Sequence, residues 1–277
     1  MRQIKKAAFT FISISFIIIS LLVVPVSGAC NNSDFIYTRD GKIECGADGE
    51  AIILKNNPEA ADPTFDELVA FINIDNTDKK PYIREGENAY VCADFAEEVH
   101  NNAEAVGIRA GWVAICFEGS EEGHAINAFE TTDKGLVYID CTNGRTFSDD
   151  GSEAKSWDTI AYLEVGKRYG VLHIDRVTSM PYEYYILEYD FYADSEKKWL
   201  EYEKMLNAFN EEVDRYNQEI RGKVYTIGSP EAKRISDWEN DLLRQEQTLE
   251  LMESELGDHW YESEFSSYTV EDVFIHW

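Results

Sequence analysis

Three residues that together can perform acyl transfer follow one another along the chain: Cys92, His124 and Asp140, at spacings of 32 and 16 residues. A cysteine becomes a strong nucleophile when a helix N-terminus and an imidazolium stabilise its thiolate. A carboxylate then holds the imidazole in the useful tautomer and orientation. The sequence therefore predicts a thiol-based catalytic site, on the condition that the fold brings these three side chains together.

The element expected to carry Cys92 is a helix. Apolar residues recur every four positions and predict a helix from about Val91 to Ala105, and Gly107 is a suitable residue to end it. Cys92 falls in the first turn and shares a face with Phe95 and Val99, the face that should be buried. We therefore expect the thiol to point toward the element on which this helix packs.

The elements expected to carry His124 and Asp140 are adjacent strands. Strand-like runs cover about 109–117, 123–130 and 136–141. The connections between them are short and contain glycine, which favours hairpins and an antiparallel meander. If position 124 or 126 lies opposite Asp140, the imidazole and the carboxylate share one face of the sheet. The meander thus places both groups within mutual reach.

The five cysteines allow one disulfide near the start of the exported chain, between Cys30 and Cys45. The middle strand of the meander would separate Cys116 from Cys141 by about 10 Å, two strand spacings. A disulfide needs Cα atoms within about 7 Å of each other. We therefore expect Cys116 and Cys141 to be buried free thiols, with Cys92 the functional one.

The first 29 residues have the pattern of a secretory signal. A basic start with Arg2, Lys5 and Lys6 precedes the apolar run Ala8–Val24, and small residues follow it. The run is long enough that an uncleaved N-terminal anchor is the alternative. Cys30 directly after the small residues leaves lipidation of that cysteine as a third possibility.

The remaining 248 residues are strongly acidic. They contain 22 Lys and Arg against 53 Asp and Glu, a formal charge of −31. Such a surface repels nucleic acid and anionic lipid. We therefore expect a secreted or cell-surface, extracytoplasmic protein without a nucleic-acid partner, which contacts a membrane only through its N-terminal segment or a lipid on Cys30. Aromatic residues make up 13% of the chain, which indicates a folded domain.

Further elements surround this central part. Residues 30–63 should be an irregular lead-in, and Thr64 with Glu67 has the pattern of a capping box that begins a helix. A polar loop spans 74–89, and additional strands are expected at 160–165 and 170–177. The loop 147–157 is polar.

The last third of the chain predicts two long helices. Apolar residues alternate at spacings of three and four in each helix, which is a heptad pattern, and a break with glycine and proline separates the two helices. The expected core positions are Trp199, Tyr202, Leu206, Phe209, Val213, Tyr216 and Ile220, then Ile235, Trp238, Leu242, Gln245, Leu249, Met252 and Leu256. The pattern predicts an antiparallel helical hairpin whose role is structural or, over 199–256, the docking of a protein partner.

The final residues alternate apolar and polar side chains, which predicts a strand from Val270 to Trp277 that returns to the main sheet. The hairpin would then be an insertion. The expected organisation is a signal peptide or anchor at 1–29, a catalytic core at 30–192, the hairpin at 193–258 and a returning segment at 259–277.

Four short runs together resemble the transglutaminase-like superfamily, which has a papain-like cysteine protease fold. They are residues 90–96 (YVCADFA), 107–110 (GIRA), 123–129 (GHAINAF) and 135–140 (GLVYID). The chain looks most similar to secreted archaeal-type members, and the resemblance covers about 62–142. It implies an α+β papain/transglutaminase-like core, a helix packed on an antiparallel sheet, here with an inserted antiparallel coiled-coil hairpin.

By this resemblance Cys92 is the nucleophile, His124 the base and Asp140 its orienter. The implied function is an exported thiol-dependent acyl hydrolase or transferase that acts on peptide or cell-envelope amides and needs no cofactor. Whether water or an amine accepts the acyl group stays open. Many members have Trp at the position of Ile126, which changes the expected wall of the substrate groove.

The backbone N–H of Cys92 is the expected first donor to an oxyanion. Tyr90 and Asn88 are candidate second donors, and Trp112 is a further candidate for substrate contact. His100 should lie at the surface, and the cysteines and histidines lack zinc-ligand spacing, so no metal is expected. The competing hypothesis is a non-catalytic surface binding or scaffold module that uses the helical hairpin.

Overall fold

A computed structural model of the chain describes residues 32–38, 41–86, 88–142, 158–178, 187–256 and 265–277. From residue 31 onward the chain forms one compact unit. None of its described helices has the length and apolar character that crossing a bilayer requires. The expected signal segment, Cys30 and the polar loop 147–157 lie outside the described residues.

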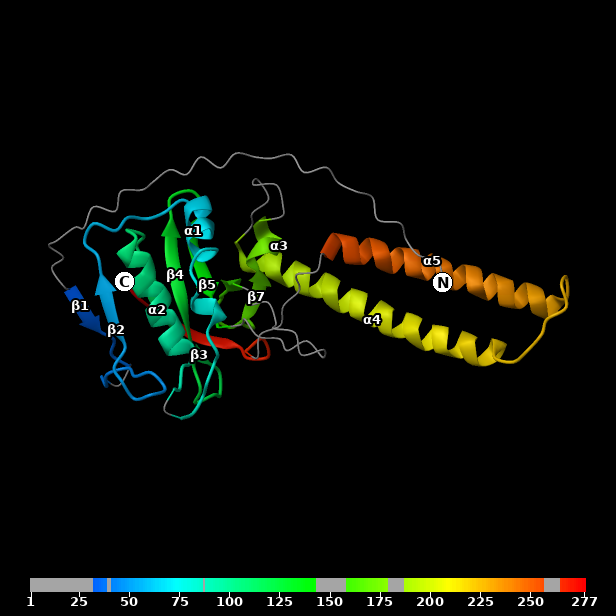
Figure 1. Ribbon diagram of the computed structural model, residues 1–277, viewed down its shortest axis with the longest axis horizontal. Helices are drawn as coiled ribbons and strands as arrows, with labels where there is room; N and C mark the ends of the chain where they lie inside the picture. Colours follow the sequence, from blue (N-terminus) through cyan, green and yellow to red (C-terminus); the bar gives the residue numbers. More distant parts are fainter. Residues whose placement is uncertain (1–31, 39–40, 87, 143–157, 179–186, 257–264) are drawn as a thin grey trace. The chain divides into compact units, whose positions relative to one another are not determined.

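The centre of the fold is a six-stranded antiparallel sheet with the strand order β7-β6-β5-β4-β3-β8 (Figure 1). Its strands are β3 (Gly111–Phe117), β4 (His124–Thr131), β5 (Gly135–Asp140), β6 (Thr159–Tyr162), β7 (Gly170–His173) and β8 (Val270–His276). The predicted α+β class and the antiparallel meander β3-β4-β5 are confirmed. Asn127 pairs with Ile139, so the register is the one that puts position 126 opposite Asp140.

Two helices cover one face of this sheet, α1 (Phe65–Ile72) and α2 (Cys92–Ala105). The predicted capping box is present, because Thr64 Oγ1 accepts from the backbone N–H of Glu67 and the Glu67 carboxylate accepts from the N–H of Thr64. Val99 on α2 is fully buried in the same cluster as Phe129 and Ile139 of the sheet. The amphipathic face of α2 therefore fixes its helix axis over β4.

A second cluster of buried side chains fills the other face of the sheet and contains no residue of the helices. Val113, Ile126 and Tyr169 belong to it, together with Phe265 and Val270 from the end of the chain. Ile126 is buried inside this cluster, so it does not form the wall of an open groove as the resemblance suggested.

The expectation of an irregular lead-in over 30–63 is wrong. This segment contains a two-stranded sheet of β1 (Asn32–Phe35) and β2 (Ile53–Asn56). Alternation buries Ile52 and Leu54 against α2. Side chains of α2 also bond the segment's backbone, for example Glu97 to the N–H of Ile53 at 3.2 Å. Alternation over so few residues gives a weak sequence signal, and the bonds to α2 are non-local.

His100 is buried, which corrects the expectation that it lies at the surface. The segment that contains β2 covers the face of α2 that carries His100, and the imidazole Nε2 lies 2.9 Å from Asn56 Oδ1. Burial lowers the pKa of His100 to about 4, so this ring is neutral and belongs to the packing of β2 on α2.

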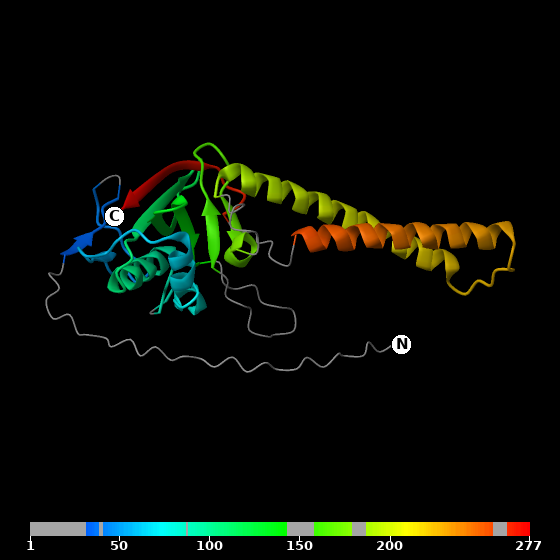
Figure 2. The same ribbon diagram turned by 90° about the horizontal axis from the view of Figure 1, so that it is seen from above.

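The expected strand 170–177 divides into β7 and a short helix, α3 (Ile174–Thr178). Two long helices follow, α4 (Tyr189–Ile220) and α5 (Pro230–Leu256), which run antiparallel (Figure 2). Arg234 bonds Glu219, and Trp238 bonds Glu212, so residue numbers rise on one helix as they fall on the other. The predicted core positions are the half-buried or buried ones of the pair.

The helix α4 begins before the expected boundary at 193 because its first turn packs on the sheet. The ring of Tyr192 stacks on Tyr162 with centroids 5.7 Å apart, and both residues belong to the main core. At the other end of the insertion β8 pairs with β3, as the alternation of the tail predicted. Both strands that flank the hairpin, β7 and β8, are therefore strands of one sheet.

Replacement of Gly170 by Ala should weaken the packing of the first turn of α4 on the sheet. A Cβ at this position would lie 2.4 Å from a ring carbon of Tyr192, so the ring must move out of its stack. We expect a loss of about 1–3 kcal/mol in the free energy of unfolding, measured by urea titration. In a double-mutant cycle with Tyr192→Ala the two effects should be strongly non-additive. Additive effects would contradict this packing.

Candidate functional site

The nucleophile candidate Cys92 is the first residue of α2 and so lies in the first turn, as the sequence predicts. The preceding residue, Val91, is held by a bond from its N–H to Asp94 Oδ2 at 2.8 Å. The N-terminal end of a helix carries free N–H groups and a partial positive charge, both of which favour an anion. The half-buried thiol of Cys92 thus lies where the backbone already favours a thiolate.

The loop before α2 brings a tyrosine to this thiol. Ile83 and Tyr90 exchange both backbone hydrogen bonds, at 2.9 and 2.8 Å, so the loop closes on itself and sets Tyr82 beside Cys92. The Tyr82 hydroxyl interacts with the Cys92 thiol and helps to lower its pKa, and the Tyr82 ring stacks on Phe95 with centroids 6.0 Å apart. The backbone of Cys92 interacts with the same hydroxyl. The tyrosine oxygen is therefore a neighbour of both the thiol and the backbone of Cys92.

The base candidate His124 is the first residue of β4, and Asp140 is the last residue of β5. His124 Nε2 lies 2.8 Å from Asp140 Oδ2, and the two residues are only 3% and 0% exposed. The Cys92 thiol and the imidazole interact, and each shifts the pKa of the other. Nε2 bonds Asp140, and the other ring nitrogen, Nδ1, is buried without a hydrogen-bond partner among the described residues, so it is the nitrogen left to face the thiol or a substrate.

Hydroxyl groups from the neighbouring chain segments hold Asp140. The Tyr169 hydroxyl donates to Oδ2 at 2.6 Å, and the backbone N–H of Thr142 donates to Oδ1 at 2.9 Å. Burial alone would raise the pKa of this carboxyl, but the charge of His124 and these hydrogen bonds lower it to about 2. Asp140 is therefore a fixed negative charge at any physiological pH.

Cys92 and His124 shift each other's pKa toward the charged forms. Burial lowers the pKa of His124, but the Asp140 carboxylate and the Cys92 thiolate outweigh burial and raise this pKa to about 10. Burial raises the pKa of Cys92, but the interaction with His124, the backbone N–H of Ala125 and the Tyr82 hydroxyl outweigh it and lower this pKa. The two shifts together favour a thiolate beside an imidazolium.

Two aromatic side chains fix the plane of the imidazole. The Phe265 ring stacks on His124 with centroids 4.2 Å apart, and the Tyr169 ring meets it edge-on at 5.6 Å. Phe265 lies just before β8, so the end of the chain forms one wall of the site. Spacing in the sequence gives no signal for Tyr82, Tyr169 or Phe265, since each reaches the site by a non-local contact.

The other residues proposed from the sequence do not meet the thiol. The Tyr90 hydroxyl donates to Glu98 at 2.6 Å, and Asn88 is exposed on the loop. Trp112 is buried beneath α2, where its Nε1 donates to the carbonyl of Ala93 at 3.2 Å. The structure therefore places Tyr82 where Tyr90 or Asn88 was expected, and it gives Trp112 a supporting position under the helix that carries Cys92.

The remaining described cysteines are free thiols, and β4 separates Cys116 from Cys141 as expected. Cys141 is buried and its pKa is well above the usual value because of burial, whereas Cys116 is half-buried and not buried as predicted. Cys45 is free and exposed, and its proposed partner Cys30 lies outside the described residues. In the described ranges no three His, Cys, Asp or Glu side chains form a group that could hold a metal ion.

Comparison of the chain with models of protein families, with curated proteins and with solved structures gives no match.

The lowered pKa of Cys92 predicts selective alkylation in mildly acidic solution. At about pH 6 iodoacetamide should label Cys92, whose pKa is lowered, faster than it labels Cys45, although Cys45 is the more exposed thiol. Because the thiolate forms at lower pH, the labelling rate should reach its plateau earlier than for a free thiol. Peptide mass mapping of the wild type, Cys92→Ala and Cys45→Ala distinguishes the two sites, and equal labelling of both at this pH would contradict the ion pair.

Removal of the Tyr169 hydroxyl should raise the thiol pKa indirectly. Tyr169→Phe deletes a hydrogen bond that holds Oδ2 of Asp140 in place; the carboxyl stays ionised, but it can turn away from His124 and so stabilise the imidazolium less. We expect the pH midpoint for alkylation of Cys92 to move upward. The matched control is Tyr90→Phe, whose hydroxyl bonds Glu98, and its midpoint should stay at the wild-type value. Identical pH midpoints for alkylation in the wild type and both variants would show that the Tyr169 hydroxyl does not affect the Cys92 thiol.

Proposed function

We propose that this protein is an exported thiol-dependent acyl hydrolase or acyltransferase of the transglutaminase-like superfamily. The observation that carries the proposal is the convergence of three groups: the Cys92 thiol at a helix N-terminus, His124 beside it, and Asp140 at 2.8 Å from the far ring nitrogen. A structural cysteine needs none of this support, since a buried thiol such as that of Cys141 stays protonated. Neighbouring groups that stabilise a thiolate are instead typical of nucleophilic catalysis.

The chemistry follows from these positions. The Cys92 thiolate attacks the carbonyl carbon of an amide or ester, and the carbonyl oxygen takes the negative charge. The backbone N–H of Cys92 donates to that oxygen. The imidazolium of His124 gives its Nδ1 proton to the leaving amine or alcohol, and a thioester on Cys92 results. Neutral His124 then removes a proton from the incoming water or amine, whose attack releases the product and restores the thiolate.

Tyr82 has a place in this sequence of steps. Its hydroxyl interacts with both the backbone and the thiol of Cys92, close to the point where an oxyanion must form. Burial and the neighbouring thiolate raise the pKa of Tyr82, so the phenol keeps its proton and can donate it in a hydrogen bond. We infer that Tyr82 is the second oxyanion donor, which swings from the thiolate to the substrate oxygen.

The finer features of the architecture belong to the same proposal. A papain-like core agrees with the helix α2 packed on an antiparallel sheet, and a coiled-coil hairpin agrees with the heptad positions on α4 and α5 that are buried or half-buried. The strongly acidic chain and the basic-then-apolar start support export to the cell surface or medium. Peptide or cell-envelope amides fit as substrates because the nucleophile is a thiolate that reacts with carbonyl carbon.

The decisive experiment is turnover of acyl substrates by the purified protein. Peptide amide and ester libraries, incubated with and without an added primary amine, should yield a hydrolysed or amine-linked product. Cys92→Ala should lower the rate by at least about 10³-fold, since it removes the nucleophile, while Cys45→Ala should keep the wild-type rate. Equal rates for wild type and Cys92→Ala would refute the enzyme.

A non-catalytic surface module is the second candidate. The observation in its favour is the solvent-facing side of the hairpin, where Leu200, Leu243 and Leu251 are exposed although they are apolar. Deletion of the hairpin and the change Cys92→Ala separate the two hypotheses. Loss of partner capture on deletion, together with no effect of Cys92→Ala in the host, would favour the binding module over the enzyme.

A further inference from the structure

The loop that joins α4 and α5, residues 221–229, carries the two most exposed aliphatic side chains of the described chain. Val224 is 98% exposed and Ile227 is 99% exposed. Single apolar side chains on a protein surface are common and need no explanation. Here two lie three residues apart at the turn of one hairpin.

Hydrogen bonds within the loop hold this arrangement. The Lys223 N–H donates to the carbonyl of Ile220 at 3.1 Å, and the Tyr225 hydroxyl donates to the carbonyl of Glu219 at 3.2 Å. At the other side Ser229 Oγ accepts from the N–H of Ala232 at 3.1 Å and caps α5. Tyr225 thus bonds back to the end of α4, while Val224 and Ile227 stay almost fully exposed.

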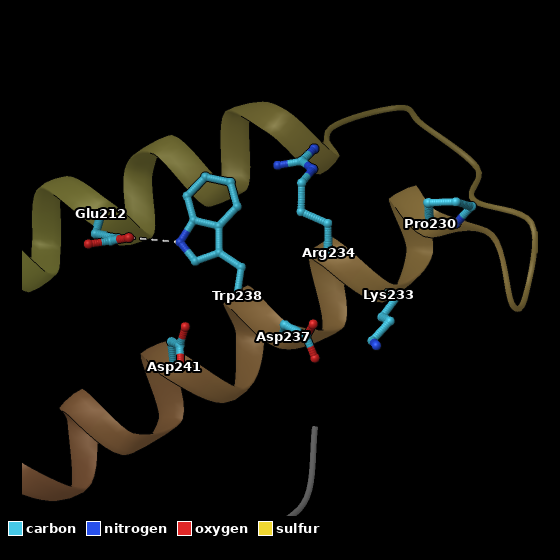
Figure 3. A pocket seen from close by; sticks show the side chains of 7 residues that line it. All are labelled: Glu212, Pro230, Lys233, Arg234, Asp237, Trp238 and Asp241. Atoms are coloured by element: carbon cyan, nitrogen blue, oxygen red, sulfur yellow. Dashed lines mark hydrogen bonds between the residues drawn. The ribbon is translucent and has the colours of Figure 1, made fainter.

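The helices below the loop are locked to each other. Trp238 lies between them and donates from Nε1 to Glu212 at 2.9 Å (Figure 3). The ring of Tyr216 meets the indole edge-on with centroids 5.4 Å apart, and Ile235, three residues before Trp238 on α5, is buried. The loop is therefore carried by two helices that are tightly paired, and its apolar side chains, Val224 and Ile227, are exposed to solvent.

The charge of this turn is opposite to that of the chain. Residues 219–234 contain four cations and two carboxylates, in a chain whose formal charge is −28. Lys223 and Arg234 both pair with Glu219, at 3.1 and 2.9 Å. Arg221 and Lys233 are exposed and form no ion pair within the described residues, and Figure 3 shows the Lys233 side chain directed away from α4. Arg221 and Lys233, which form no ion pair among the described residues, thus belong to the same turn as the exposed Val224 and Ile227.

We propose that this turn, residues 221–233, is a membrane-docking tip that inserts Val224 and Ile227 into the interface of a bilayer with anionic headgroups. Aliphatic side chains that enter the headgroup region leave water, and neighbouring Lys and Arg bind the lipid phosphates. A tip of two side chains is too small for a stable protein interface, which buries about 1,200–2,000 Å². Insertion into lipid needs no complementary surface on a partner.

The acidity of the rest of the chain does not prevent this contact. The helix α4 has 32 residues, which at 1.5 Å each span about 48 Å from its seat on the sheet to the tip. The Debye length at physiological ionic strength is about 8 Å. Repulsion between anionic lipid and the acidic core is therefore screened at the tip, where residues 219–234 carry a net charge of +2. The tip is a local exception to the expectation that this chain avoids anionic membranes.

The test uses the chain from residue 31 onward, which forms one compact unit and lacks the apolar N-terminal run. It should co-sediment with phosphatidylcholine vesicles that contain phosphatidylglycerol, and less with phosphatidylcholine alone. The double variant Val224→Ser/Ile227→Ser should bind at least about tenfold more weakly, since it removes the inserted apolar surface. The matched control is Leu251→Ser, an exposed leucine at the far end of α5, which should bind as the wild type does.

The variant Arg221→Gln/Lys233→Gln tests the cationic part and should lose the preference for anionic vesicles and the dependence on salt. Thermal melting monitored by circular dichroism should be the same for all variants, because the altered side chains pack against nothing. Equal sedimentation of the wild type and the Val224/Ile227 variant overturns the proposal. So does the absence of vesicle binding by the wild type, including the case in which the tip instead captures a purified protein.

Discussion

The buried contact between His124 and Asp140 is the constraint on which the site depends. A carboxylate that is fully buried costs several kcal/mol in lost hydration, and only a nearby cation and good hydrogen bonds offset that cost. Here the imidazolium, Tyr169 and Thr142 supply them. The same carboxylate keeps His124 charged, and the charged ring lowers the pKa of Cys92. Three strands and a helix must therefore be in place before the thiolate forms.

This dependence explains why the end of the chain matters to chemistry at its centre. β8 pairs with β3 at one edge of the sheet, and Phe265, just before β8, stacks on the imidazole. The hairpin of α4 and α5 stands between β7 and β8 in the sequence. Phe265 follows the hairpin in the sequence, so the chain must pass through the hairpin before Phe265 can stack on His124. An insertion at this point is tolerated because its first turn is anchored by Tyr192.

Local patterns in the sequence predicted the elements that local forces determine. The capping box of Thr64, the place of Cys92 in the first turn of α2 and the antiparallel pairing of β4 with β5 follow from capping chemistry, periodicity and short connections. The sequence narrows the register of that pair only to position 124 or 126 opposite Asp140, and the structure has 126 there. The partners Tyr82 and Tyr169 could not be predicted in this way. A backbone bridge between Ile83 and Tyr90 sets the first, and the edge of the sheet near β7 sets the second, so neither has a repeating pattern to reveal it.

The error at His100 has the same origin. Helical geometry alone places this residue away from the face that meets the sheet, and a solvent-facing position follows if nothing else covers α2. The short sheet of β1 and β2 covers it instead, and the ring becomes a neutral partner of Asn56. His100 and His124 are thus both buried, with pKa values of about 4 and about 10, because only one of them faces a carboxylate. The partner of a buried histidine, and not its burial, decides whether it can serve as the acid and base for a thiol.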